Sequence, residues 1–129
     1  MNKVHFSSQS DNWGTPAKLY EALNEEFHFN DDPCPLDPYA IGGLMRAWGT
    51  SVFVNPPYSK IADWVKYAHE QAKQNKTVVM LIPSRTDTRW WHDFCMKADE
   101  IRFIRGRLKF GNAKHSAPFP SALVIWRAK

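Results

Sequence analysis

Cysteine and long hydrophobic runs are scarce in this sequence of 129 residues. Its two cysteines, Cys34 and Cys95, form no CxxC pair, which argues against a disulfide framework or a zinc site, so we expect no bound metal. No run of 18 apolar residues is present, and the first twelve residues lack the apolar core of a signal peptide. The sequence therefore predicts a soluble cytoplasmic protein that makes no membrane contact.

Internal repeats, low-complexity segments and linkers are also absent from the sequence. The length suits one hydrophobic core but leaves no room for a separate target-recognition domain, so we expect a single domain over residues 1–129. Apolar residues make up 43% of the chain, and it holds 6 Trp and 8 Phe, which is typical of a packed globular domain. We expect this domain to be a monomer or a weak homodimer.

Charge is distributed unevenly along the chain. Residues 1–32 hold two Lys and six Asp or Glu, a net charge of −4, whereas residues 97–129 hold eight Lys or Arg and two acids, a net charge of +6. A basic C-terminal third suits a polyanionic partner such as nucleic acid. The alternative is a solvated basic face without a partner.

Alternating helical and strand patterns predict an α/β fold with a mostly parallel sheet. Thr15 is a suitable N-cap for a first helix that begins at Pro16. The apolar run 77–82 is typical of a strand buried on both faces, and 107–110 with 122–126 predicts a C-terminal antiparallel hairpin. Three helices are expected: one over 16–27, one that follows Ser59 and one over 88–98. The other expected strands cover 27–29, 51–54 and 101–104.

Two polar segments come directly after predicted strands. Asp32-Pro33 follows 27–29, and Asn55-Pro56-Pro57-Tyr58 follows 51–54. Ligands of open α/β sheets bind beyond the carboxyl ends of the strands. We therefore expect both segments at one rim of the sheet, and we expect the active site there.

The segment Asn55-Pro56-Pro57-Tyr58 suits methylation of an amino nitrogen. The lone pair of an adenine amine is delocalised into the ring, so the amine must be held in directed hydrogen bonds while its nitrogen becomes tetrahedral. Asn55 supplies a side-chain carbonyl, and Pro56 supplies a backbone carbonyl whose direction the two proline rings fix. Tyr58 offers a flat face on which a base flipped out of a duplex can stack. The alternative is a proline-rich turn after a strand.

Six motifs occur in order along nearly the whole chain. They are DNWGTP at 11–16, FHFNDDPC at 27–34, NPPYS at 55–59, LIPSRTDT at 81–88, GRLKF at 106–110 and APFPSAL at 117–123. With these motifs the sequence resembles the compact phage-type DNA N6-adenine methyltransferase (Dam-like) family. The resemblance implies a compact, minimal Rossmann-like methyltransferase fold, methylation of the N6 amine of adenine in DNA, and a phage or prophage gene expressed in a bacterial cell.

The resemblance also implies S-adenosylmethionine as the methyl donor. Asp32 is then expected to accept hydrogen bonds from the cofactor, and Pro33-Cys34 resembles the opening of an Asp-Pro-x-x-Gly-x-Gly cofactor loop. No Gly-x-Gly follows, because Pro35-Leu36-Asp37-Pro38 stands there instead. The alternative for Asp32 is an acid in a turn without a ligand.

The N-terminal segment is expected to complete the cofactor site. Thr15 and Pro16 resemble the element that contacts the methionine end of the cofactor in related enzymes, although both residues suit a helix start without any ligand. Trp13 is expected either over the cofactor adenine or in the core. Asn55 is expected to border the cofactor as well as the base.

Basic and aromatic residues in the second half of the chain are candidates for contact with duplex DNA. Alternate basic residues can follow a phosphate backbone, and an aromatic ring can stack on a displaced base. For Phe110 the alternative is an inward-facing strand residue. The candidates are Arg85, Arg89, Arg107, Lys109, Phe110 and Lys114.

Two other functions fit the same residues. The Asn-Pro-Pro-Tyr chemistry also serves methyltransferases that act on RNA or on a protein glutamine, and the basic C-terminal third favours nucleic acid over protein. A DNA- or cofactor-binding protein without turnover is the second alternative, which the missing Gly-x-Gly supports.

Overall fold

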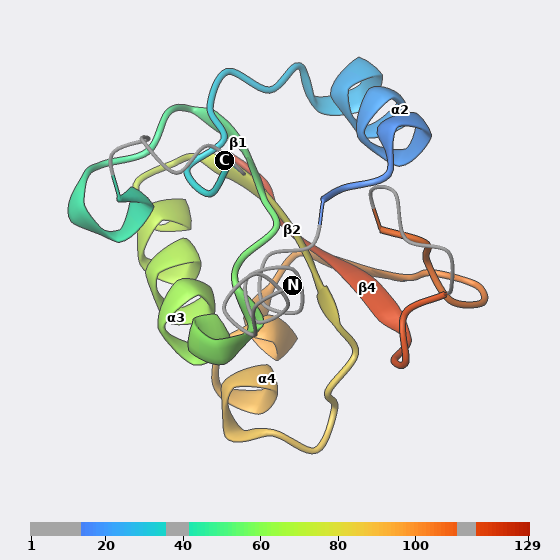
Figure 1. Ribbon diagram of the computed structural model, residues 1–129. Helices are drawn as coiled ribbons and strands as arrows, with labels where there is room; N and C mark the ends of the chain where they lie inside the picture. Colours follow the sequence, from blue (N-terminus) through green and yellow to red (C-terminus); the bar gives the residue numbers. More distant parts are fainter. Residues whose placement is uncertain (1–13, 36–41, 111–115) are drawn as a thin grey trace.

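The computed structural model describes residues 14–35, 42–110 and 116–129. These residues form a four-stranded sheet in the order β1-β2-β4-β3, with helices on both faces (Figure 1). Within this described part, no helix has the length and apolar character needed to cross a membrane. The predicted α/β class is confirmed.

The first half of the sheet is a parallel strand–helix–strand unit. β1 (Ser51–Val54) pairs in parallel with β2 (Thr77–Pro83), and α3 (Ile61–Ala72) makes the crossover between them. A parallel pair needs such a crossover because a tight turn can join only antiparallel neighbours. The predictions of both strands and of the intervening helix are confirmed.

The second half of the sheet is antiparallel, which makes the sheet mixed. β4 (Ser121–Trp126) lies between β2 and β3 (Glu100–Phe103) and runs antiparallel to both. The expectation of a mostly parallel sheet is therefore wrong. The expected antiparallel pair at the C-terminus is present, but β4 pairs with β3 and not with 107–110, which forms no strand.

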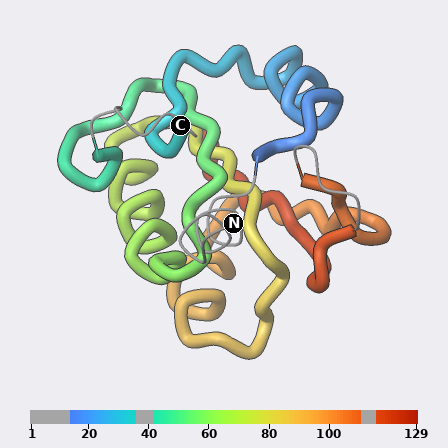
Figure 2. Tube along the Cα trace, viewed as in Figure 1, coloured from blue at the N-terminus to red at the C-terminus, as the bar shows by residue number. Residues whose placement is uncertain are grey.

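Side chains alternate between two cores, one on each face of the sheet. Val78, Met80 and Ile82 of β2 pack towards α3 and α4 (Arg89–Asp93). Val79 and Leu81 pack towards α2 (Ala17–Phe27) and the segment that precedes β4. Figure 2 shows the blue α2 and the orange segment 104–110 on the side of the molecule away from the green α3.

The start and end of α2 differ in detail from the sequence prediction. Pro16 occupies the N-cap position, and no side chain from residues 14–35, 42–110 or 116–129 caps the helix, so the expected capping by Thr15 is wrong. The helix ends at Phe27 as expected, where His28 adopts the left-handed conformation (φ 51°). This turn prevents a strand at 27–29, and the chain instead meets β1 through a single parallel bridge between Asp31 and Val52.

The helix expected over 88–98 is split in two. Thr88 caps α4 by accepting a hydrogen bond from the Trp91 backbone, but the α-helix ends at Asp93. A 3-10 turn over Cys95–Lys97 follows and leads into β3. The buried Trp91 and Cys95, one on each side of the break, pack in the same core.

Candidate active site

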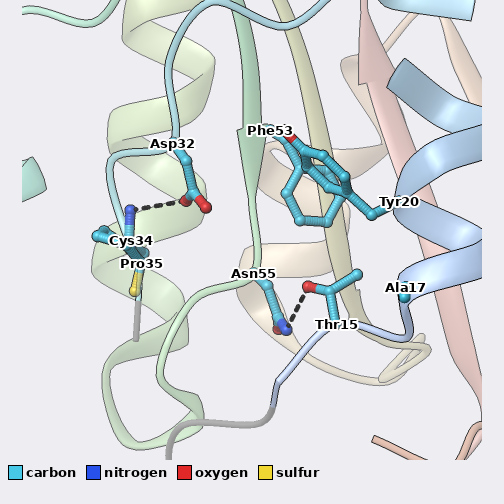
Figure 3. Close-up of a pocket in the computed structure, with 8 residues that line it drawn as sticks. All are labelled: Thr15, Ala17, Tyr20, Asp32, Cys34, Pro35, Phe53 and Asn55. Carbon is cyan, nitrogen blue, oxygen red and sulfur yellow. Dashed lines mark hydrogen bonds between the residues drawn. The ribbon is translucent and has the colours of Figure 1, made fainter. Parts of the chain in front are cut away.

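Asn55 lies directly beyond the carboxyl end of β1 and is 8% exposed. The two prolines that follow turn the chain out of the sheet, because a proline cannot donate to a strand ladder. The Asn55 side-chain Nδ2 donates a hydrogen bond of 3.0 Å to the Thr15 Oγ1, from the segment before α2 (Figure 3). Residues 40 positions apart in the sequence thus meet at the rim of the sheet.

A cavity of about 380 Å³ opens beside Asn55. Its volume lies within the range of about 300–1,000 Å³ that is usual for small-molecule sites. Residues from the N-terminal segment, from α2, from the loop after Asp31 and from β1 line it. They are Thr15, Ala17, Tyr20, Asp32, Cys34, Pro35, Phe53 and Asn55. Thr15, Asp32, Cys34 and Asn55 were predicted site residues, and the structure brings these four together.

The acidic pair Asp31-Asp32 divides into one structural residue and one cavity residue. Asp31 accepts two hydrogen bonds from the Arg46 guanidinium, of 2.7 and 2.9 Å, and a third from the Gly49 backbone N–H. The hydrogen bonds from Arg46 are the main reason that the pKa of Asp31 is lowered. Asp32 turns towards the cavity instead (Figure 3).

The Asp32 carboxylate accepts only a 3.2 Å hydrogen bond from the Cys34 backbone N–H within the described part of the chain. Partial desolvation by the surrounding protein raises the pKa of this carboxyl, although much of the residue is open to solvent. Burial disfavours the charged form of an acid, and a cation placed nearby favours it again. Asp32 is therefore the acid of this pair that suits a cationic ligand.

Tyr20 and Phe53 form an aromatic wall that the sequence analysis did not assign to the site. The Tyr20 ring, from α2, meets the Phe53 ring of β1 edge to face, with centroids 5.2 Å apart. Both residues fit the apolar patterns of their elements, so no separate pattern predicts their place beside a cavity. Figure 3 shows the pair on the side of Asn55 that faces α2.

A glycine remote from the Asp32 loop takes part in its packing. A Cβ atom at Gly43 would lie 2.2 Å from the Pro33 carbonyl oxygen and 2.7 Å from the Trp64 ring. Only glycine permits such a close approach of two backbone segments. The loop that starts at Asp32 thus lacks a following Gly-x-Gly, but it packs against a glycine that comes ten positions after Pro33.

Tyr58 begins a 3-10 turn (Tyr58–Lys60) after the two prolines. Its ring meets the Phe119 ring edge to face at 5.1 Å, and burial raises the pKa of its hydroxyl. The contact joins the segment after β1 to the segment before β4.

The sequence was also compared with those of known families and proteins. Residues 4–128 match the sequence profile of the family described as DNA N-6-adenine-methyltransferase (Dam). The chain belongs to the Dam family. The resemblance drawn from the six motifs is confirmed.

Two phage relatives of this Dam-family chain are each described as a DNA N-6-adenine-methyltransferase. The protein of Haemophilus phage HP1 (strain HP1c1) is 30% identical over 142 aligned positions, which cover 95% of this chain and 82% of the relative. The protein of Escherichia phage T1 is 39% identical over 67 residues, which cover 50% of this chain and 28% of the relative. The chain thus matches less than a third of the phage T1 protein.

Four of the basic residues expected to contact DNA are exposed in the Dam-family chain. Arg85 and Arg89 lie after the carboxyl end of β2, and Arg107 and Lys109 lie in the segment after β3. Phe110 differs from the expectation of stacking on a base, because it is 3% exposed and packs in the core beneath α2. Trp13 and Lys114 lie outside the described residues.

Part of the positive charge at the C-terminus is neutralised within the protein. Arg102 forms two hydrogen bonds of 2.7 Å with Glu26 of α2 and one of 2.6 Å with Glu100. Arg127 also donates to Glu100, and these hydrogen bonds lower the pKa of Glu100 to about 2. The net charge of residues 97–129 therefore overstates what is available to a polyanion.

Proposed function

We propose that this chain transfers a methyl group from S-adenosylmethionine to the N6 amine of adenine in DNA. The observation that carries the proposal is the Asn55 amide beside a cavity whose other wall bears Asp32. Membership of the Dam family and the names of its two phage relatives support the substrate.

The cavity has the groups that S-adenosylmethionine needs. The Asp32 carboxylate can accept hydrogen bonds from the cofactor ammonium or ribose, and a cation there would favour the charged form of this acid. Ala17 lines the cavity at the first turn of α2, which holds no acidic residue and receives no side-chain cap from the described part of the chain. Such a helix start suits a carboxylate. When bound, the cofactor supplies an electrophilic methyl group.

Asn55 and Pro56 would hold the adenine amine. The Asn55 side-chain carbonyl and the Pro56 backbone carbonyl accept the two amine hydrogens, which directs the nitrogen lone pair out of the plane of the base. No strong base is required, since the amine proton becomes acidic only after the methyl group has transferred. The two prolines hold the backbone carbonyl in a fixed direction.

The base would have to leave the duplex to reach this site. Flipping costs a few kcal/mol, and stacking on one aromatic ring returns about 1–3 kcal/mol. We assign this stacking to Tyr58, whose ring is steadied by Phe119. The exposed Arg85, Arg89 and Arg107 would supply the remaining binding energy through phosphate contacts.

The test is incubation of the protein with labelled S-adenosylmethionine and unmethylated duplex DNA, RNA or a protein extract in separate reactions. We expect label only in DNA, at N6 of adenine. Asn55→Ala should abolish transfer while the Kd for S-adenosylhomocysteine stays within about tenfold, as expected when an interaction made in the transition state is removed. Label in RNA or on protein glutamine would show that DNA is not the substrate. Cofactor binding without any transfer would show that the chain is a binding protein without turnover.

Cells can report the recognition sequence and the biological substrate at once. Genomic DNA from a methylation-deficient bacterium that expresses the chain should acquire N6-methyladenine, and the sequence around each modified base would give the recognition site. We expect a short site, because the chain has few segments that could read bases. Expression of Asn55→Ala is the matched control and should leave the DNA unmodified.

A further inference from the structure

We propose that Thr15 is a positioning residue for Asn55, which orients the amide that holds the substrate amine. The inference rests on the proposed function. It differs from the role that family resemblance gives Thr15, which is contact with the methionine end of the cofactor.

The geometry joins two segments that lie 40 residues apart in the sequence. Thr15 lies outside α2, because the helix begins at Ala17 and takes no cap from the Thr15 side chain. Its hydroxyl instead accepts the 3.0 Å hydrogen bond from Asn55 Nδ2 (Figure 3). Since Asn55 is 8% exposed, bulk water has little access to replace this contact.

An asparagine at such a site needs an external partner to fix its amide. The terminal torsion of asparagine has a broad, roughly two-fold energy profile, so the side chain alone does not select where its oxygen points. The amide nitrogen donates and the oxygen accepts, and they lie on opposite sides of the group. A hydrogen bond from Nδ2 to Thr15 therefore directs the carbonyl oxygen away from Thr15.

Thr15 also lines the cavity, so the two possible roles must be separated by experiment. A residue that orients Asn55 acts on the reacting amine, and its loss lowers kcat. A residue that binds the cofactor acts on affinity, and its loss raises the Kd for S-adenosylhomocysteine. Thr15→Val keeps the shape of the side chain and removes the hydroxyl, whereas Thr15→Ser keeps the hydroxyl.

The kinetic test compares these two variants at saturating cofactor and DNA. We expect Thr15→Val to lower kcat about tenfold or more, the cost of one lost hydrogen bond in the transition state. The Kd for S-adenosylhomocysteine should stay within about twofold, since the cavity keeps its shape. Thr15→Ser should restore kcat. An unchanged kcat with a raised Kd would overturn the inference in favour of cofactor contact.

A second readout needs no activity and no cofactor. In ¹⁵N-labelled protein, the side-chain amide signals of Asn55 are assigned by their loss in Asn55→Ala. We expect their hydrogen exchange to be slow in the wild type and in Thr15→Ser, and faster in Thr15→Val. Equal exchange in all three proteins would overturn the inference. If the wild type transfers no methyl group, the proposed function fails, and this comparison alone decides whether Thr15 orients Asn55.

Discussion

The Arg46 guanidinium donates two hydrogen bonds to the Asp31 carboxylate. The neighbouring Asp32 is the acid of the pair that faces the cavity. Arg46 directly follows the 3-10 turn Gly43–Met45, so the ion pair ties this turn to the residue before Asp32. The side chains of Asp31 and Arg46 are 15% and 34% exposed, which limits solvent screening. One acid of the pair thus stabilises the fold, and the other is left for a ligand.

The two acids should therefore respond differently to the same substitution. Asp31→Asn removes a charged acceptor of three hydrogen bonds and should lower the free energy of unfolding by about 1–2 kcal/mol. Asp32→Asn changes an exposed carboxylate that accepts one 3.2 Å hydrogen bond from the Cys34 backbone N–H, and it should leave stability nearly unchanged. Urea unfolding monitored by tryptophan fluorescence measures both effects.

Cofactor binding should show the reverse order. Asp32→Asn is expected to weaken binding of S-adenosylhomocysteine, measured by calorimetry, while Asp31→Asn keeps affinity under conditions in which it is folded. Each variant is the control for the other, because both exchange a carboxylate for an amide at adjacent positions. Equal effects of the two substitutions on binding would contradict the division of roles.

The sequence predicts the parallel unit well because its signals are local. An apolar run, a crossover helix with apolar residues at helical spacing and a second apolar run identify β1, α3 and β2 without reference to the rest of the chain. The place of β4 has no such signal. Every residue of β4 is buried, and a fully buried strand looks the same whether its neighbours run parallel or antiparallel.

The site was predicted in part for similar reasons. Asn55 and Asp32 stand out because polar residues directly after strands are expected at the rim of a sheet. Thr15 was predicted near the cofactor, but its partner was not, since the same hydroxyl also suits a helix cap. Phe110 illustrates the limit for aromatic residues. Its sequence context does not distinguish a buried ring from one that stacks on a base. The structure shows that the Phe110 ring is buried in the core beneath α2.

Gly43 gives a prediction about the loop that carries Asp32. Gly43→Ala would place a Cβ atom 2.2 Å from the Pro33 carbonyl oxygen, so the backbone must shift. We expect a loss of about 1–3 kcal/mol in the free energy of unfolding, the usual cost of overpacking, together with weaker cofactor binding. Urea unfolding and calorimetry measure the two effects.

Gly42 provides the matched control for this substitution. Among the described residues, a Cβ atom there would approach nothing closer than the Met45 side chain, at 3.8 Å. Gly42→Ala should therefore change stability by less than about 0.5 kcal/mol, as for most surface substitutions. A Gly43→Ala protein as stable as Gly42→Ala would show that the Asp32 loop does not depend on this close approach.

His69 predicts how stability depends on pH. Its ring lies in α3 against Phe94 and Trp126, and within the described residues its buried Nδ1 has no hydrogen-bond partner. Burial, and then the positive charges of Lys73 and Lys97, lower its pKa below the ordinary 6.5, while Glu70 acts in the opposite direction. The unfolded chain then binds this proton more readily, so stability falls as the pH drops through 6.5 towards the lowered value.

The His69→Phe variant tests this dependence, because phenylalanine keeps an aromatic ring and removes the titrating group. We expect the Tm of the wild type to fall more than that of His69→Phe between pH 7.5 and pH 5.5. His28→Asn serves as the control, since it removes an exposed histidine at a left-handed position that asparagine tolerates. If His28→Asn, rather than His69→Phe, reduced the dependence of Tm on pH, His69 would not be the group responsible.

We expect substitutions of Arg107 and of Arg127 to affect DNA binding differently, although both residues lie in the basic C-terminal third. Arg107 is exposed and forms no ion pair within residues 14–35, 42–110 and 116–129. Arg127 donates to Glu100 at 2.6 Å and lies over the Phe27 ring, so its charge is already used within the protein.

Each phosphate contact contributes about 0.9 to the slope of log K against log salt. Arg107→Ala should therefore weaken binding to a DNA duplex and reduce that slope by about one contact, whereas Arg127→Ala should leave the slope unchanged. Fluorescence anisotropy across a salt series measures both, and equal slopes for Arg107→Ala and the wild type would remove Arg107 from the interface.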